Sequence, residues 1–286
     1  VGRRPLPWAL AALLLMMTLA APALAMRTWP QDAGSSPTDQ TARQAYDLVT
    51  EEFGAGANGP MLVVAETERV SAGAVVEVAE ELADLPGVAQ VGPAQESADG
   101  ALVMFEIQPE FGPTDERTGE LVQQIRDDVL PEGAELTGLT PMFADIADML
   151  AERLWLVIGF VVLVSVVLLA MVFRSVVVPV KAAVMNLLSI GAAYGVVTAV
   201  FQWGWGSGLL GLDHAMPVSS WLPVLMFAIL FGLSMDYEVF LLSRVREEWH
   251  RTGDSRTSVA DGLASTAKVI TAAAAIMVVV FGSFML

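Results

Sequence analysis

Five long apolar runs dominate the pattern of hydrophobic and polar positions along this chain. They cover about residues 8–26, 154–173, 180–203, 221–242 and 268–286. Each approaches the ~20 apolar residues needed to cross a bilayer. Between the first two runs the pattern becomes polar. The pattern therefore predicts a transmembrane helix over 1–27, a water-exposed extracytoplasmic domain over 28–150, and a bundle of four helices over 151–286 with a cytoplasmic link at 243–268.

In the water-exposed domain, segments with a strand pattern alternate with segments with a helix pattern. Residues 61–66, 89–91, 102–107 and 135–139 read as strands, and 72–84 and 114–129 as helices, after a first helix over 39–53. The order β-α-β-β-α-β is typical of a ferredoxin-like α+β fold. The apolar positions predict a core that contains Val63, Val75, Leu82, Val103, Phe105 and Ile125.

Charge is divided unevenly between the two regions. The 286 residues are 55% hydrophobic and carry a net charge of −17. Residues 27–152 contain five Lys and Arg against 25 Asp and Glu, a net of −20, so the remainder carries +3. Lys and Arg gather before the first run, between the second and third, and between the fourth and fifth. The positive-inside rule then places residues 27–152 and the loop 204–220 outside the cytoplasm.

Two further features concern the ends of the apolar runs. All seven tryptophans fall at or near these ends, which is typical of an aromatic belt at the membrane interface. The first run also ends in Ala23-Leu24-Ala25, which resembles a signal-peptide cleavage site. A retained helix and a cleaved signal both leave the predicted topology unchanged.

Asp236 is the main candidate functional residue, because it interrupts the apolar run 221–242. A carboxylate within a span costs about 2.5–3.5 kcal/mol on insertion scales, and such residues usually mark ion or proton pathways. Ala228 and Gly232 precede it at spacings of eight and four, so all three share one helix face that suits close helix packing. Tyr237 can hydrogen-bond to a carboxylate. We predict a proton relay at Asp236 and Tyr237; the alternative is a buried polar residue with a structural role.

Three other residues are candidates to support that relay. Glu238 follows two positions later, about 200° round the helix, and could instead form a structural ion pair near the cytoplasmic end. Thr271 and Ser283 lie in the fifth span, whose small residues would ordinarily serve helix packing. Ser258 and Asp261 have the spacing of a capping box that would begin a short helix before this span.

Several kinds of chemistry find no support in the sequence. The chain has no cysteine, and its two histidines, His214 and His250, fall on opposite sides of the predicted membrane, so we expect no metal site. Residues 54–59 match G-x-G-x-x-G but follow a helix and precede a strand, which favours a flexible loop over a nucleotide site. A second aspartate for intramembrane proteolysis is missing from the predicted spans, and no basic stripe suits nucleic acid. We therefore expect neither an enzyme nor a bound cofactor.

The quoted residues resemble one known family. Residues 231–248, FGLSMDYEVFLLSRVREE, resemble the Asp-Tyr helix of the MMPL family within the RND transporter superfamily. The basic turn and the AAVMNLL segment in 174–188 are also similar, as is the start of the porter domain in 28–65. The resemblance implies a proton-driven exporter of lipids or other hydrophobic molecules in the bacterial cell membrane, with Asp236 and Tyr237 on the proton path.

The same resemblance implies an incomplete bundle. Members of the family are similar to one another in having two repeats, each with one helix, a porter domain and five more helices. This chain resembles the second repeat, and it ends inside the fifth span, before the sixth span that the resemblance implies. Asp-Tyr pairs from the two halves meet in the family, so we expect a companion half or a homo-oligomer, with membrane lipids and protons as further partners. The alternative function is a non-transporting membrane scaffold or sensor with a ligand-binding outer domain.

Overall fold

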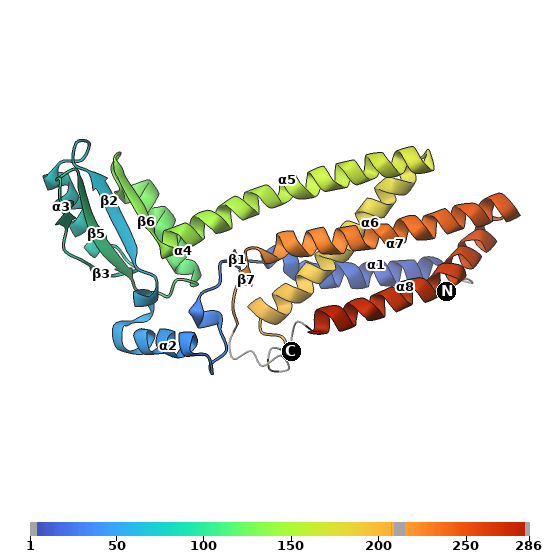
Figure 1. The fold of residues 1–286 in the computed structure, drawn as a ribbon, viewed down its shortest axis with the longest axis horizontal. Coiled ribbons are helices and arrows are strands. Elements are labelled where there is room, and N and C mark those ends of the chain that lie inside the picture. Colours follow the sequence, from blue (N-terminus) through green and yellow to red (C-terminus); the bar gives the residue numbers. More distant parts are fainter. Residues whose placement is uncertain (1–4, 207, 209–214, 284–286) are drawn as a thin grey trace. The chain divides into compact units, whose positions relative to one another are not determined.

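The computed structural model describes residues 5–206, 208 and 215–283 (Figure 1). These residues form two compact units. The helical unit contains described residues within 1–21, 156–193 and 224–286. The outer unit contains those within 22–155 and 194–223, so it includes the described part of the loop between the third and fourth predicted spans as well as the α/β domain.

An antiparallel sheet with one helical face forms the α/β domain. The strands β2 (Met61–Glu66), β3 (Val88–Val91), β5 (Leu102–Pro109) and β6 (Ala134–Gly138) lie in the order β3-β5-β2-β6, and β4 (Gln95–Glu96) also pairs with β5. Val63 on β2 is opposite Phe105 on β5 and Leu136 on β6. Alternate strand residues are buried with apolar residues of α3 (Ala72–Ala83) and α4 (Glu116–Gln124), so one face of the sheet carries the core.

The predicted core of this domain is confirmed. All six apolar residues expected there are at most 6% exposed, and the strand predicted over 61–66 has those bounds. The helix predicted over 114–129 begins later, at Glu116, because Asp115 accepts a hydrogen bond from the Arg117 amide and caps it. A π-helical turn, η4 (Ile125–Val129), ends it.

A short parallel pairing joins the two distant parts of the outer unit. Strand β1 (Thr28–Trp29) pairs with β7 (Val218–Ser219). Beside it, the Gln202 side chain accepts a hydrogen bond from the Arg27 amide and donates one to the Ala25 carbonyl, each at 2.8 Å. The sequence does not predict this pairing, because two-residue strands have no detectable periodicity.

Trp29 departs from the predicted aromatic belt. It is 7% exposed and belongs to the core of the α/β domain. A Cβ atom at Gly119 would lie 3.2 Å from its ring, so α4 packs directly on the indole. The interface prediction is therefore wrong for Trp29, because β1 draws it into the core. The other six tryptophans are each at least 43% exposed.

The glycine-rich loop over 54–59 is a packed structural element. It forms the 3₁₀ helix η3 (Ala55–Asn58) after α2 (Thr41–Phe53), with Gly54 at φ 90°. A Cβ atom at Gly56 would lie 1.7 Å from the Pro109 carbonyl oxygen, so this position admits only glycine. The expected flexible loop is therefore a tight contact with the end of β5.

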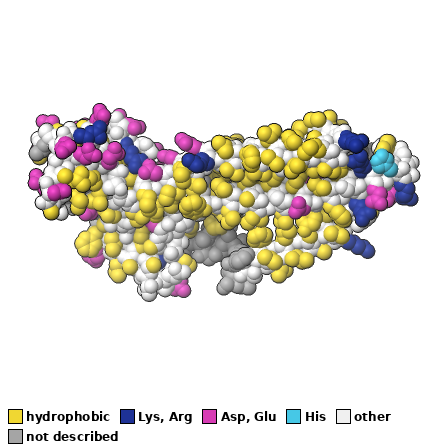
Figure 2. All heavy atoms as spheres, turned by 45° about the horizontal axis from the view of Figure 1, so that its top comes forward, with side chains coloured by type: hydrophobic (Ala, Val, Ile, Leu, Met, Phe, Trp, Pro, Cys, Tyr) yellow, Lys and Arg dark blue, Asp and Glu magenta, His cyan; other side chains and the backbone are white. Residues whose placement is uncertain are grey.

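Five helices in the described residues are long and apolar enough to cross a membrane, as predicted. They are α1 (Pro5–Ala20) with its 3₁₀ extension η1 (Ala21–Ala25), α5 (Leu139–Phe173), α6 (Val177–Val197) with the π turn η5 (Thr198–Gln202), α7 (Leu222–Thr252) and α8 (Ser255–Ser283). Hydrophobic side chains cover these helices, and Lys and Arg gather at one end of the helical unit (Figure 2). Of the most apolar 18 residues in α6 and η5, 39% are buried. The corresponding stretches of the other four helices are at most 17% buried, so α6 is the most buried of the five.

The link between α7 and α8 is shorter than the predicted segment 243–268. Only Gly253 and Asp254 lie between the two helices. Gly253 has φ 69°, which suits the end of α7, and the Asp254 carboxylate accepts a 2.9 Å hydrogen bond from the Thr257 amide. The predicted capping box at Ser258 is wrong, because Asp254 caps the helix four residues earlier and Ser258 is buried within it.

Candidate functional site on helix α7

Asp236 lies on an uncovered face of α7. Asp236, Gly232 and Ala228 are all exposed among the described residues, and a Cβ atom at Gly232 would have no neighbour within 4 Å. The buried face of the helix is formed by Phe227, Phe231 and Met235, which are 1%, 2% and 9% exposed. α7 therefore packs within the chain through its bulky side chains and leaves the face that carries the carboxylate open.

Asp236 borders a shallow hollow between α7 and α8. Its lining comprises Leu233, Asp236, Tyr237 and Phe240 of α7 and Val269 of α8, and its volume is about 350 Å³. Within the described part of the chain Asp236 makes no hydrogen bond or ion pair. The hollow therefore brings together the predicted pair, Asp236 and Tyr237, in an apolar setting.

The predicted supporting residues are placed less closely. Thr271 and Ser283 of α8 are both exposed and do not line this hollow, and the Ser283 hydroxyl donates to the Val280 carbonyl at 2.7 Å. Glu238 is half-buried and lies within electrostatic reach of Lys181 on α6. The basic neighbour of Glu238 is therefore a lysine of the preceding helix, rather than one of the arginines that follow the apolar run of α7. A role in proton transfer stays a prediction for all three.

A stripe of small residues holds α8 against α7. Ser258, Gly262 and Thr266, spaced by four, are buried, and Ser258 and Thr266 are no more than 1% exposed. A Cβ atom at Gly262 would lie 3.0 Å from the Cα of Val245 on α7. This close crossing positions Val269, further along α8, beside the Asp236 hollow. The spacing of Ser258, Gly262 and Thr266 is visible in the sequence, but the charged residues around them predicted a polar link there.

α7 also holds the end of α5. The Arg246 guanidinium donates a 3.1 Å hydrogen bond to the Val172 carbonyl, in the last turn of α5. Arg174, just beyond that turn, has φ 51°, the left-handed conformation in which many helices end. A cation at a helix C-terminus satisfies an unpaired carbonyl and complements the helix dipole. Arg246 thus links α7 to α5 at the end of the helical unit that is rich in Lys and Arg.

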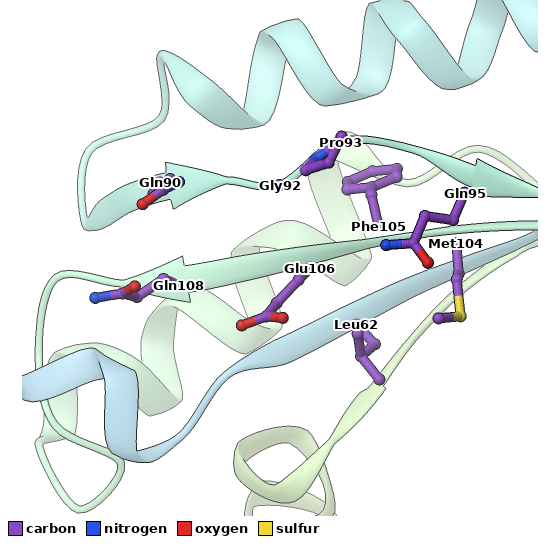
Figure 3. A pocket seen from close by; sticks show the side chains of 9 residues that line it. All are labelled: Leu62, Gln90, Gly92, Pro93, Gln95, Met104, Phe105, Glu106 and Gln108. Atoms are coloured by element: carbon purple, nitrogen blue, oxygen red, sulfur yellow. The ribbon is translucent and has the colours of Figure 1, made fainter. Parts of the chain in front are cut away.

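The open face of the sheet carries a separate hollow of about 270 Å³ (Figure 3). Gln90 and Gln108 face each other across β3 and β5, and Glu106 projects from β5 beside them. The lining contains a single acid and neither histidine nor serine, so it offers no acid–base pair or activated nucleophile. The described residues also include no group of three or more His, Asp and Glu that could hold a metal ion.

Comparison with known proteins identifies the family. The MMPL family model matches residues 34–286. The chain belongs to the MMPL family. Membrane protein YdfJ of Bacillus subtilis is 34% identical over 289 residues, which cover 99% of this chain and 40% of that protein. This MMPL chain is therefore a multi-pass membrane protein, as the five apolar helices indicate.

Mycobacterial relatives carry more specific descriptions. The "mycolic acid-containing lipids exporter MmpL11" of Mycolicibacterium smegmatis is 33% identical, over 99% of this chain and 31% of that protein. The "heme uptake protein MmpL11" of Mycobacterium tuberculosis is also 33% identical, over 99% of this chain and 30% of its own length. The chain thus spans between 30% and 40% of the length of these three relatives.

Proposed function

We propose that this chain is one half, the C-terminal repeat, of a proton-motive-force-driven exporter of lipids or other hydrophobic small molecules. The observation that carries the proposal is the placement of Asp236 on the uncovered, small-residue face of α7. The buried positions around it, Phe227, Phe231 and Met235, are apolar. An acid placed this way has no packing role within the chain and remains available for proton exchange.

The free-energy cost of an exposed carboxylate within the membrane supports the presence of a partner that covers Asp236. A carboxylate that faces hydrocarbon costs about 2.5–3.5 kcal/mol on insertion scales, and intramembrane acids normally face a bundle interior. Gly232 and Ala228 leave room for another helix to approach the backbone of α7. We infer that this face meets an equivalent face of a companion half or of a second copy of the chain.

Proton movement would then drive the conformational cycle. Protonation of Asp236 from one side would neutralise the face and favour one packing of the bundle, and release to the other side would favour a second packing. A membrane potential of 100 mV supplies about 2.3 kcal/mol for each elementary charge moved across it. Tyr237, on the same hollow, would donate a hydrogen bond to the ionised form.

The outer unit fits the role of an extracytoplasmic porter domain. The strand order β3-β5-β2-β6, with α3 and α4 against one face, supports a ferredoxin-like fold. Residues 27–152 carry a net charge of −20, and Lys and Arg gather beside the other ends of the predicted spans. Lipid or another hydrophobic molecule as cargo is supported by the description of the Mycolicibacterium smegmatis relative.

An efflux assay tests the proposal. The chain would be produced with a companion half, and export of a fluorescent lipid would be followed with and without a protonophore. We expect Asp236→Asn to abolish protonophore-sensitive export, because an amide keeps the shape of the side chain but cannot change charge. Tyr237→Phe should reduce export less, since it removes one hydrogen bond and leaves the charge.

Asp261→Asn provides the matched control, because Asp261 is an exposed acid on α8 away from the hollow. Full protonophore-sensitive export by Asp236→Asn would refute the proton-coupling role. Persistent absence of export with every companion tested would favour the alternative of a membrane scaffold or sensor.

A further inference from the structure

A third cleft, distinct from the α7 hollow and from the hollow on the sheet, lies within the outer unit. Its volume is about 360 Å³, within the range of small-molecule pockets. α2 forms one wall, and the first turns of α5 form the other through Leu139 and Phe143. The short turn η2 (Ala33–Ser35) and its preceding residue Asp32 close one end, with Asn58 nearby.

α2 presents its apolar stripe to this cleft rather than to a core. Ala42, Ala45 and Val49 recur at helical spacing and line the cleft together with Tyr46. The helix has no buried residue, and none of its residues belongs to the core cluster of the α/β domain. An amphipathic helix normally buries such a stripe, so the stripe offers apolar surface to a ligand.

Asp32 and Tyr46 make the closed end of the cleft polar. A Cβ atom at Gly34 would lie 3.1 Å from Asp32 Oδ1 and 2.8 Å from the Tyr46 ring, so both side chains converge there. The Asp32 oxygens are buried, and the polar groups that face them include the Gly34 amide and the Tyr46 hydroxyl. Burial and the neighbouring Asp32 raise the pKa of Tyr46 to about 12, so its hydroxyl keeps its proton.

The charges around the cleft exclude an anionic ligand head. No Lys or Arg belongs to the lining. Arg43, on the same helix, already pairs with Asp47 at 2.7 Å and donates to the carbonyls of Gly34 and Ser36. An anion would therefore meet an acidic end whose neighbouring cation, Arg43, is already paired, whereas a hydroxyl could donate to the Tyr46 oxygen.

We propose that this cleft binds a single-chain amphiphile with an uncharged, hydroxyl-bearing head. The alkyl chain lies along Ala42, Ala45 and Val49 against Phe143, and the head donates a hydrogen bond to Tyr46. Binding does not depend on transport. The cleft's role as a cargo site does rest on the proposed exporter function, because an exporter of hydrophobic molecules would pass its cargo through the outer unit.

Photolabelling of the full chain in lipid nanodiscs tests the site. The probe is a monoacylglycerol with a diazirine in its alkyl chain, and mass spectrometry locates the labelled peptides. We expect labels on residues 42–49 and 139–143, displaced by excess unlabelled monoacylglycerol. A fatty acid probe with the same chain and diazirine should label these peptides about tenfold less, a difference of about 1.4 kcal/mol.

Two variants of one helix provide the matched comparison. Ala45→Phe fills the cleft and should remove the labels, whereas Leu48→Phe, at an exposed position of α2 outside the lining, should keep them. Tyr46→Phe should keep chain labelling but remove the preference for the hydroxyl head. Hydrogen exchange over β2 and β5 checks that each variant is folded.

The outcomes separate this site from the proposed function. Equal labelling by the two probes, or unchanged labelling in folded Ala45→Phe, would overturn the binding site and leave the exporter proposal intact. Specific labelling that persists in Asp236→Asn supports the site, even where that variant no longer exports lipid.

Discussion

Gly262 on α8 crosses Val245 on α7 so closely that a Cβ atom at position 262 would lie 2.7 Å from Cγ2 of Val245. The backbone of Val245 is nearly as near, since its nitrogen would be 3.1 Å away. A flexible side chain can move aside, but backbone cannot without shifting the whole helix. The α7–α8 hairpin therefore depends on glycine at this crossing, whereas Gly232 on α7 has open space around it.

The contrast between these two glycines gives the first prediction. Glycine to alanine in a helix normally stabilises by up to about 1 kcal/mol, and we expect that effect for Gly232→Ala. Gly262→Ala should instead destabilise the chain by about 1–3 kcal/mol, because the added methyl overpacks the crossing. Thermal unfolding of the two variants in the same detergent measures the difference. Equal midpoints would show that α7 and α8 do not cross here.

Asp32 and Asp115 give a prediction of opposite pH dependence. Burial raises the pKa of Asp32, with the Gly34 amide and the Tyr46 hydroxyl opposing it. The folded chain then holds this proton to higher pH than the unfolded chain, so stability falls as pH rises above about 3.9. Asp32→Asn should therefore stabilise the outer domain at pH 7 and have little effect near pH 3.

Asp115 should behave in the reverse way. Its hydrogen bonds with the Arg117 side chain lower its pKa, so its stabilising contribution is present at neutral pH and is lost as pH falls. Asp115→Asn should destabilise the domain at pH 7 and approach the parent chain in acid. Hydrogen exchange of the β2 and β5 amides, corrected for intrinsic rates, follows both variants. Identical pH profiles would contradict the environments described for these two acids.

The membrane topology provides a third prediction, which the absence of native cysteine makes simple to test. Ala98→Cys lies on an exposed loop of the outer domain, and Ser255→Cys lies at the exposed start of α8. We expect an impermeant maleimide to label Ala98→Cys in intact cells and Ser255→Cys only after the membrane is ruptured. The opposite pattern would invert the predicted orientation of every span.

Local patterns predicted the α/β domain well. The alternation over 61–66 identified β2 and its buried residues, because a half-buried strand has a period of two that survives without knowledge of its partners. Phe105 and Val103 were placed in the core for the same reason. The pairing of β1 with β7 escaped, since two residues at each end of a long separation have no period to detect.

Polar segments between apolar runs were harder to interpret. Ser258 looked like a helix cap because serine is common there, yet Asp254 is an equally good cap and follows the glycine that ends α7. Asp236 was recognised from the free-energy cost of a carboxylate within an apolar helix. That its face of α7 is uncovered could be seen only in the structure. The partner that we propose for that face could not be inferred from local spacing either.

The pairing between Thr28 and Val218 also sets an order of events during synthesis. These partners are 190 residues apart, whereas β2 to β6 all lie between Met61 and Gly138. At about 5–20 residues per second, the ribosome needs roughly 10–40 s to reach β7 after making β1. The α/β core can form during that interval, before Ser219, the strand partner of Trp29, has been synthesised. The seam between β1 and β7 would therefore close last, after the two membrane helices that separate the strands in the chain, α5 and α6, have been synthesised.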